Sequence, residues 1–224
     1  MNQVLYGGVD PSGSARRPSG CALIDQEGRM VESRLCYSDE EILDFLNQKG
    51  LDSVAVDAPG GLPMDMGLCC LEDEPVCECE ILNTRQCEKI LIRNGFSLYP
   101  INKNTFSSAK QWCRRGLLLY LRMHNLGMTT FEVYPTASRK ILFPCQEFPR
   151  PKSSRAARQV LQNLLERRMP FLPPRGKDMV YSDHILDAIL AAYTLYLFRN
   201  RNQGELIGDP REGQILLPRF SFQF

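Results

Sequence analysis

The sequence predicts an α/β domain, and three observations lead to that fold class. Short apolar runs of strand length alternate with longer segments that carry apolar residues at helical spacing. The chain has 224 residues, of which 43% are hydrophobic and 24% are charged, as in globular proteins with one large core. No apolar run approaches the roughly 18 residues that a membrane span needs. We therefore expect residues 1–224 to form a single domain.

The first part of the predicted sheet lies in residues 5–56. Leu5–Val9 is a predicted buried strand, and residues 21–36 are predicted to form two strands joined around a Glu-Gly turn. Ser38 precedes three acidic residues and an apolar stripe, which is typical of a helix N-terminus. Residues 53–56 form the next predicted strand. The expected order is three strands, a helix and a fourth strand.

The second part of the chain is predicted to be mainly helical. Helices are expected at residues 84–94, 107–126, 153–168 and 182–200, with a fifth strand at 129–134 and a short strand in the tail at 214–217. Residues 62–83 are irregular and rich in cysteine, so they are predicted to be an insertion after the fourth strand. The sequence thus predicts a five-stranded mixed sheet flanked by helices in three layers.

Three of the predicted strands end on a single carboxylate that is followed within a few residues by proline or glycine. These residues are Asp10, Asp57 and Glu132. Burying a carboxylate is costly without a partner of opposite charge. Since adjacent parallel strands end at the same edge of a sheet, we expect the three carboxylates to converge around something positive. Taken singly, Asp10 and Asp57 could equally be turn formers.

The last predicted helix adds further polar groups. His184 and Asp187 are three residues apart and Asp183 and Asp187 are four apart, so they share one helix face. Oxygen-rich clusters hold Mg²⁺ or Mn²⁺, and a pair of such ions can clamp a phosphodiester. The predicted ion ligands are Asp10, Asp57, Glu132, Asp183 and Asp187. The alternatives are a dipole-stabilising role for Asp183 and a structural role for His184.

Charge is distributed unevenly along the chain. Residues 1–102 hold 8 Lys/Arg and 17 Asp/Glu, whereas residues 103–201 hold 17 Lys/Arg and 6 Asp/Glu. A basic half favours a polyanionic partner, namely nucleic acid, although charges in sequence blocks can also intermix on the surface. The candidate phosphate contacts are Arg114, Arg115, Lys152, Arg155, Arg158, Arg167 and Arg168. Arg16 and Arg17 are further candidates beside Asp10. Arg85 is predicted to bind substrate or support the site, or else to form a helix-surface salt bridge.

Five of the nine cysteines lie close together in or next to the predicted insertion. They are Cys69, Cys70, Cys77, Cys79 and Cys87. Thiolates bind Zn²⁺ or an iron–sulfur cluster, but the spacing differs from paired C-x-x-C knuckles, so free thiols are the alternative. The N-terminus shows no basic stretch followed by an apolar segment, so we expect no signal peptide, a cytoplasmic location and no membrane partner.

Several motifs together resemble an uncharacterised family of predicted RNase H-like nucleases, the domain of unknown function numbered 429. The matching segments are GVDPSGS (8–14), SGCALID (19–25), VAVDAPGGLP (54–63), RQCE (85–88), FEVYPTAS (131–138), DHILDAILAA (183–192) and GDPREGQILLP (208–218). The resemblance implies an RNase H-like fold and a Mg²⁺- or Mn²⁺-dependent nuclease that acts on DNA or RNA.

The resemblance also implies roles for individual residues. On the pattern of the resolvase branch, Asp10, Asp57, His184 and Asp187 carry the metal ions, and Asp183 assists His184 or substitutes for it. Glu132 matches the motif of the predicted nucleases instead, and completes the expected catalytic set. Resolvase relatives dimerise, which leaves a homodimer open.

Two other function classes remain open at the level of sequence. One is an ATP-dependent phosphotransferase of the actin/hexokinase type, which usually has a second, repeated lobe that these 224 residues do not show. The other is a non-catalytic binding protein that keeps the fold and uses the cysteine-rich insertion to hold a partner. Metal-dependent cleavage of nucleic acid would distinguish the nuclease from both of these alternatives.

Overall fold

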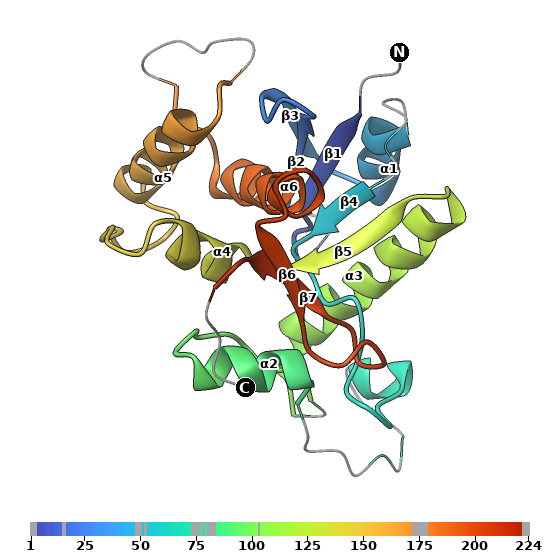
Figure 1. Ribbon diagram of the computed structural model, residues 1–224. Coiled ribbons are helices and arrows are strands. Elements are labelled where there is room, and N and C mark those ends of the chain that lie inside the picture. Colours follow the sequence, from blue (N-terminus) through green and yellow to red (C-terminus); the bar gives the residue numbers. More distant parts are fainter. Residues whose placement is uncertain are drawn as a thin grey trace.

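The structure, a computed structural model, describes residues 4–14, 17–47, 51, 53–72, 77, 79, 84–102, 104–171 and 179–220. These residues form a mixed α/β fold around one seven-stranded sheet, with strand order β3-β2-β1-β4-β5-β7-β6 (Figure 1). The strands are β1 (Leu5–Asp10), β2 (Ser19–Asp25), β3 (Met30–Cys36), β4 (Ser53–Val56), β5 (Thr129–Val133), β6 (Gly204–Ile207) and β7 (Ile215–Pro218). The helices are α1 (Asp39–Asn47), the 3₁₀ turn η1 (Leu68–Leu71), α2 (Gln86–Arg93), α3 (Ser107–Asn125), α4 (Pro135–Leu142), α5 (Arg155–Arg168) and α6 (Asp183–Arg201).

The sheet contains seven strands, two more than the predicted five-stranded sheet, and one of these two is the tail strand that was predicted separately. The tail segment predicted at 214–217 is β7, which pairs in parallel with β5, and β6 pairs antiparallel with β7 at the edge of the sheet. The sequence analysis missed β6 because it is only four residues long and immediately follows α6. Asn202 ends that helix in the left-handed conformation, at φ 51°, and so separates the two elements.

Helices cover both faces of the sheet. α1 and α3 pack on one face against Val9, Val54 and Val56, whereas α5 and α6 pack on the other against Tyr6 and Ala22 (Figure 1). Because side chains alternate along a strand, each strand sends alternate residues into the two cores. α6 is buried on nearly all sides, which matches its uniformly apolar sequence. The predicted three-layer arrangement is therefore present.

Two glycines let α6 lie unusually close to the sheet. A Cβ atom on Gly8 would lie 2.0 Å from the carbonyl oxygen of Ala188, and one on Gly20 would lie 2.0 Å from that of His184. Neither backbone atom could give way, so only glycine fits at these strand positions. This close packing brings the first turn of α6 beside the end of β1.

α4 is a helix that the sequence analysis did not predict. Pro135 was expected to stop the fifth strand, and it also begins this helix at the first position, where its missing N–H costs nothing. The predicted insertion at 62–83 is described at 62–72, 77 and 79, where it includes η1; its other residues lie outside the described part of the chain. Among the described residues, no helix is both long enough and apolar enough to cross a bilayer.

Candidate active site

Asp10 and Asp57 lie side by side where the parallel strands β1 and β4 end, on the carboxyl-terminal side of the sheet. β1 and β4 are parallel neighbours in which Val9 pairs with Val56, and the backbone N–H of Asp57 donates to the Val9 carbonyl oxygen at 2.8 Å. Asp10 follows Tyr6 and Gly8 in alternation, so its side chain points to the α6 face of the sheet. The predicted convergence of these two strand-end carboxylates is present.

The N-terminus of α6 adds the predicted helical residues to the same place. The Ser182 hydroxyl caps the helix by accepting from the Ile185 N–H at 3.3 Å. In the first turn, His184 Nδ1 lies 2.7 Å from Asp10 Oδ2. Asp187, one turn later, is buried. Asp183 lies at the cavity rim and is half-buried.

Lys152 supplies positive charge to this group. It lies in the segment between α4 and α5, and its Nζ is paired with Asp187 Oδ2. About 40% of the Lys152 side chain is exposed, against 6% for Asp187, so the ammonium group enters the site from solvent. The sequence analysis had proposed Lys152 only as a phosphate contact on the basic half of the chain.

Burial and crowding shift the protonation of the site. Burial, followed by the charges of Asp10 and Asp187, raises the pKa of Asp57 well above its ordinary value. Burial likewise raises the pKa of Asp187, while Lys152 opposes that shift. The hydrogen bond to Asp10 raises the pKa of His184. These are the shifts expected where like charges are held together out of water.

These groups line one cavity of about 430 Å³. Asp10, Asp57 and Asp187 lie in its lining together with His184 and Lys152. Another part of the lining is aromatic, and consists of Tyr99, Phe106 and Trp112. Tyr99 and Phe106 are 75% and 53% exposed, and their rings meet edge to face at 5.5 Å. These aromatic residues could not be found from the sequence, because the loop before α3 carries no motif and Trp112 lies within an expected helix.

Glu132 reaches the same edge of the sheet but faces the other way. It pairs with Val56, one residue before Asp57, so alternation turns its side chain to the opposite face from Asp10 and Asp57. Both of its oxygens are bound by Arg85, from Nη1 to Oε2 at 2.6 Å and from Nη2 to Oε1 at 2.7 Å. The Gly60 N–H also donates to Oε2, at 2.7 Å. The positive partner of Glu132 is therefore a guanidinium group.

Arg85 is the centre of a buried ionic network. Only 2% of its side chain is exposed, and its Nε also binds Glu88 Oε1 at 3.0 Å. Glu88 in turn accepts from the backbone N–H of Ile101 at 3.1 Å. Since Ile101 lies in the lining of the cavity, the network ties β5 and α2 to the loop that carries the aromatic residues. Arg85 is buried, so its ion pairs with Glu88 and Glu132 are not the helix-surface salt bridge that was the alternative.

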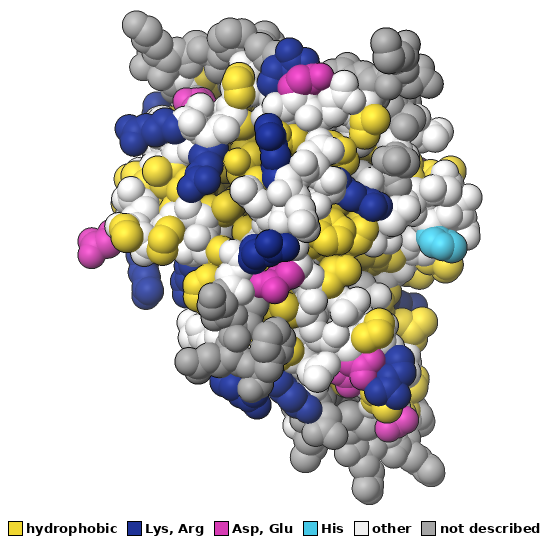
Figure 2. Space-filling view, viewed as in Figure 1, with side chains coloured by type: hydrophobic (Ala, Val, Ile, Leu, Met, Phe, Trp, Pro, Cys, Tyr) yellow, Lys and Arg dark blue, Asp and Glu magenta, His cyan; other side chains and the backbone are white. Residues whose placement is uncertain are grey.

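The other predicted arginine contacts are divided among several places. Arg16 lies outside the described residues, and Arg17 lies in the cavity lining. Arg114 forms an exposed pair with Glu72 at 3.0 Å. Arg115 is bound to Asp39 and donates to the Ser12 carbonyl oxygen at 2.5 Å, so it holds the turn that follows Asp10. In the sequence, Lys and Arg are concentrated in residues 103–201. On the face visible in Figure 2 their side chains are spread out.

Four of the five predicted cysteines form a compact group. The Sγ atoms of Cys69, Cys70, Cys77 and Cys79 all lie within 4.8 Å of one another, so this cluster could hold a metal ion. Cys70 and Cys77 are 3.4 Å apart, and hydrogen bonds from Cys70 and from the Cys79 backbone lower the pKa of Cys77 to about 7. The cluster packs beside Cys113 of α3.

Cys87, the fifth predicted ligand, is not part of that group. It lies in α2, packed against Ile90 and Leu91 in the core that α2 forms with β6 and β7. Burial raises its pKa to about 12, as expected for a thiol in apolar surroundings. Cys87 is close to the other four cysteines in the sequence, but α2 begins after Cys79 and carries Cys87 into a different core.

The acidic residues supply oxygen ligands, and carboxylate oxygens are the preferred ligands of Mg²⁺ and Mn²⁺. A nearby positive charge would oppose the burial and the carboxylate repulsion that raise the pKa of Asp57. Their oxygens are spread more widely than the cysteine sulfurs: among the described residues, only the cysteine group brings three or more ligand atoms within 4.8 Å of one another. Asp10 and Asp187 are each turned toward a partner, His184 and Lys152 respectively.

The fold and site together define an α/β protein with an acidic cavity where parallel strands end. A search against protein families matches residues 8–212 to the family described as "Protein of unknown function (DUF429)". The chain belongs to this family, as its motifs predicted. No curated protein and no solved structure gave a significant match.

Proposed function

We propose that this protein is a divalent-metal-dependent nuclease that hydrolyses phosphodiester bonds in DNA or RNA. The observation that carries the proposal is the meeting of Asp10, Asp57 and Asp187 in one cavity, at the edge where β1 and β4 end. Three carboxylates held together against their own repulsion are costly to the fold. Such an arrangement is expected at a site for a cation and a phosphate.

We also infer that the fold is RNase H-like. The support is the order of elements around the site: three antiparallel strands, a helix and a parallel fourth strand, with an acid after the first and fourth strands. A His and an Asp three residues apart on the last helix match the resolvase branch in type and position. In this assignment β6 and β7 extend the five-stranded sheet at one edge.

The proposed roles follow from the positions of the side chains. Asp10, Asp57 and Asp187 would hold the ions, with Asp183 at the rim as a further oxygen ligand. A bound Mg²⁺ or Mn²⁺ would supply positive charge against the phosphodiester oxygens. Because both oxygens of Glu132 are bound by Arg85, we assign Glu132 to support and not to ion binding.

His184 is the proposed general base. Its Nδ1 is bound to Asp10, which leaves Nε2 to accept a proton from the attacking water. The water oxygen forms a bond to phosphorus as one ester P–O bond breaks, and the leaving oxygen takes a proton from solvent. Lys152 is placed to contact the phosphate, because its ammonium group enters the same cavity.

A cleavage assay tests this proposal. End-labelled single-stranded and duplex oligonucleotides of DNA and RNA would be incubated with the protein and with Mg²⁺ or Mn²⁺. We expect ion-dependent shortening of at least one substrate, and a loss of about 100-fold or more in Asp57→Asn. Asp44→Asn, on the exposed side of α1, is the matched control and should keep full activity. Failure of the folded protein to cut any substrate, or equal cutting by Asp57→Asn, would contradict the proposal.

We further propose that the ion held by the cysteine cluster is zinc. Four thiolates around a tetrahedral Zn²⁺ have sulfur–sulfur separations of about 3.8 Å, which agrees with sulfurs that all lie within 4.8 Å of one another. Its place beside α3 suggests a structural role, because the first turns of α3 carry part of the aromatic wall of the cavity. We also propose a cytoplasmic location, where cysteines stay reduced, because no disulfide joins any of the nine cysteines, all of which lie in the described part of the chain.

Elemental analysis of the purified protein tests the zinc assignment. We expect about one zinc ion per chain in the wild type. Cys77→Ser should lose most of it, while Cys87→Ser should retain it, because Cys87 lies in a different core. Iron in place of zinc, or equal zinc in both variants, would overturn the assignment.

A further inference from the structure

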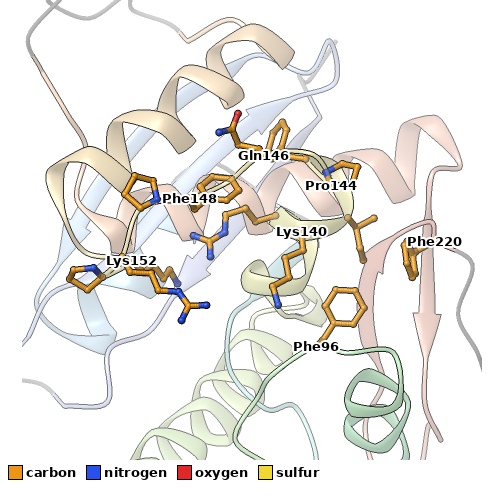
Figure 3. Close-up of a pocket in the computed structure, with 13 residues that line it drawn as sticks. Phe96, Lys140, Pro144, Gln146, Phe148, Lys152 and Phe220 are labelled. Carbon is orange, nitrogen blue, oxygen red and sulfur yellow. The ribbon is translucent and has the colours of Figure 1, made fainter.

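A large cavity among the described residues lies beside the candidate active site, and of its lining residues only Lys152 has a role in the proposed chemistry. It is a groove of about 960 Å³, at the upper end of the range for ligand pockets. Its walls come from α4, from the segment that joins α4 to α5, from Phe96 after α2, and from Phe220 after β7 (Figure 3).

The charged residues that line this groove are all cations. They are Arg139, Lys140, Arg150 and Lys152, and no acidic residue is among the described residues of the lining. The Nε atom of Arg139 is buried and has no hydrogen-bond partner within the described part of the chain. Burial lowers the pKa of Arg139, and the charge of Asp187 opposes that shift. An anionic ligand in the groove would add negative charge close to this guanidinium group.

Aromatic rings alternate with these cations. The guanidinium carbon of Arg139 lies 4.5 Å from the centre of the Phe148 ring, and Lys140 Nζ lies 5.8 Å from that of Phe96. Phe96 and Phe220 meet edge to face at 5.9 Å. In Figure 3, Lys140 and Phe96 point toward each other across the middle of the groove, between Lys152 at one end and Phe220 at the other.

The groove meets the active-site cavity at one shared residue. Lys152 lies in the lining of both, and on the active-site side its ammonium group is paired with Asp187. A chain of phosphates that crosses the groove would therefore stay close to cationic side chains until it reaches the three aspartates. This continuity favours a linear polyanion over a compact ligand that would occupy the groove alone.

We infer that this groove binds single-stranded nucleic acid and leads it into the active site, an inference that rests on the proposed nuclease function. Alternating cations and aromatic rings suit a single strand, because phosphates pair with the cations while unpaired bases stack on the rings. A duplex keeps its base faces stacked within the helix, so it could use the cations but not the rings. The groove thus selects single strands, or single-stranded ends and flaps.

Fluorescence anisotropy with labelled oligothymidylate and oligouridylate tests this inference, in buffer without added Mg²⁺ or Mn²⁺ so that binding is measured without cleavage. We expect Lys140→Glu/Arg150→Glu to weaken binding by at least about tenfold and to reduce its salt dependence. Phe220→Ala, which removes an exposed ring, should weaken binding by about fivefold or more. A duplex of the same length should bind more weakly than the single strand.

The control variant is Arg122→Glu/Arg199→Glu. It reverses the same amount of charge at the far ends of α3 and α6, whose first turns reach the site. It should bind as the wild type does. If it weakens binding as much as the groove variant, the effect is general electrostatics and the inference is wrong. Equal binding of duplex, tight binding that the groove variants leave unchanged, or binding of acidic peptides but no oligonucleotide would also overturn it.

The binding assay and the cleavage assay test the two proposals independently. If the groove variants lose binding while the wild type cuts no substrate, the groove assignment holds and the nuclease proposal falls. If the wild type cuts a substrate and the groove variants cut it equally well at limiting concentration, the nuclease proposal holds and the groove assignment falls.

Discussion

Two neighbouring carboxylates, Asp57 and Glu132, show how a single position along a strand decides a role. Glu132 pairs with Val56, so the alternation of the strands places it on the opposite face from Asp57. There it meets Arg85 and becomes part of a buried ionic network. Asp57 instead meets the like charges of Asp10 and Asp187. One carboxylate is stabilised by the fold, whereas the other is placed where the fold alone does not stabilise it.

The buried arginine gives a first prediction. Arg85→Met should lower the free energy of unfolding by about 3–5 kcal/mol, because it leaves Glu132 and Glu88 buried without their counter-ion. Arg114→Met is the matched control: its pair with Glu72 is half exposed on both sides, so the loss should be about 1 kcal/mol or less. Urea denaturation measures both, and similar losses would show that the Arg85 network does not stabilise the core.

Asp57 gives a prediction of the opposite sign. Asp57→Asn should make the protein more stable when no divalent ion is added, because it removes a charge that burial and two other carboxylates disfavour. For a domain of this size, about 1 kcal/mol corresponds to a rise of about 2–4 °C in melting temperature. Mn²⁺ should raise the melting temperature of the wild type more than that of the variant. A melting temperature below that of the wild type without Mn²⁺ would show that Asp57 has a structural role.

At the scale of elements, α6 determines whether the site forms. Its close approach to β1 and β2 depends on Gly8 and Gly20, where a side chain would collide with helix backbone. This approach places His184 next to Asp10. The motif that contains Gly8 therefore has two parts: Asp10 supplies a carboxylate to the site, and the glycine leaves room for the backbone of α6.

Gly20→Ala should displace the first turn of α6. We expect a loss of stability of about 1–3 kcal/mol or more, because the new Cβ would lie 2.0 Å from a backbone oxygen. It should also weaken Mn²⁺ binding, since His184 and Asp187 move away from Asp10. In Gly13→Ala the nearest atom to the new Cβ is 3.6 Å away, so thermal melting should change little. Equal effects of the two substitutions would contradict the packing argument.

At the scale of the whole molecule, most of the fold and much of the site could be predicted from the sequence. The first four strands were predictable from short apolar runs, and the site acids from the carboxylates that follow the first and fourth of these runs, because parallel strands end on the same side of a sheet. Both α4 and β6 were missed because they are short and adjoin stronger elements. The side to which Glu132 points was missed because it depends on the register between β4 and β5, which local patterns do not encode.

The contacts of the basic residues were also beyond the sequence. Arg85, Arg114 and Arg115 all pair with acids of the protein itself, and those partners lie far apart in sequence or on another element. Four cations, Arg139, Lys140, Arg150 and Lys152, line the groove beside α4, where no motif had pointed. The described residues also form a single seven-stranded sheet, with no second, repeated lobe among them.

The most direct test of the central claim is a calorimetric titration of zinc-loaded protein with Mn²⁺. Zinc loading keeps the cysteine cluster out of the measurement, so that any heat comes from the oxygen ligands. We predict that the wild type and Asp44→Asn bind one or two Mn²⁺ ions, as expected for a two-metal site, and that Asp57→Asn loses at least one of them. If the wild type binds none, or if Asp57→Asn binds as the wild type does, the carboxylates at the sheet edge are not the metal site and the nuclease proposal fails with them.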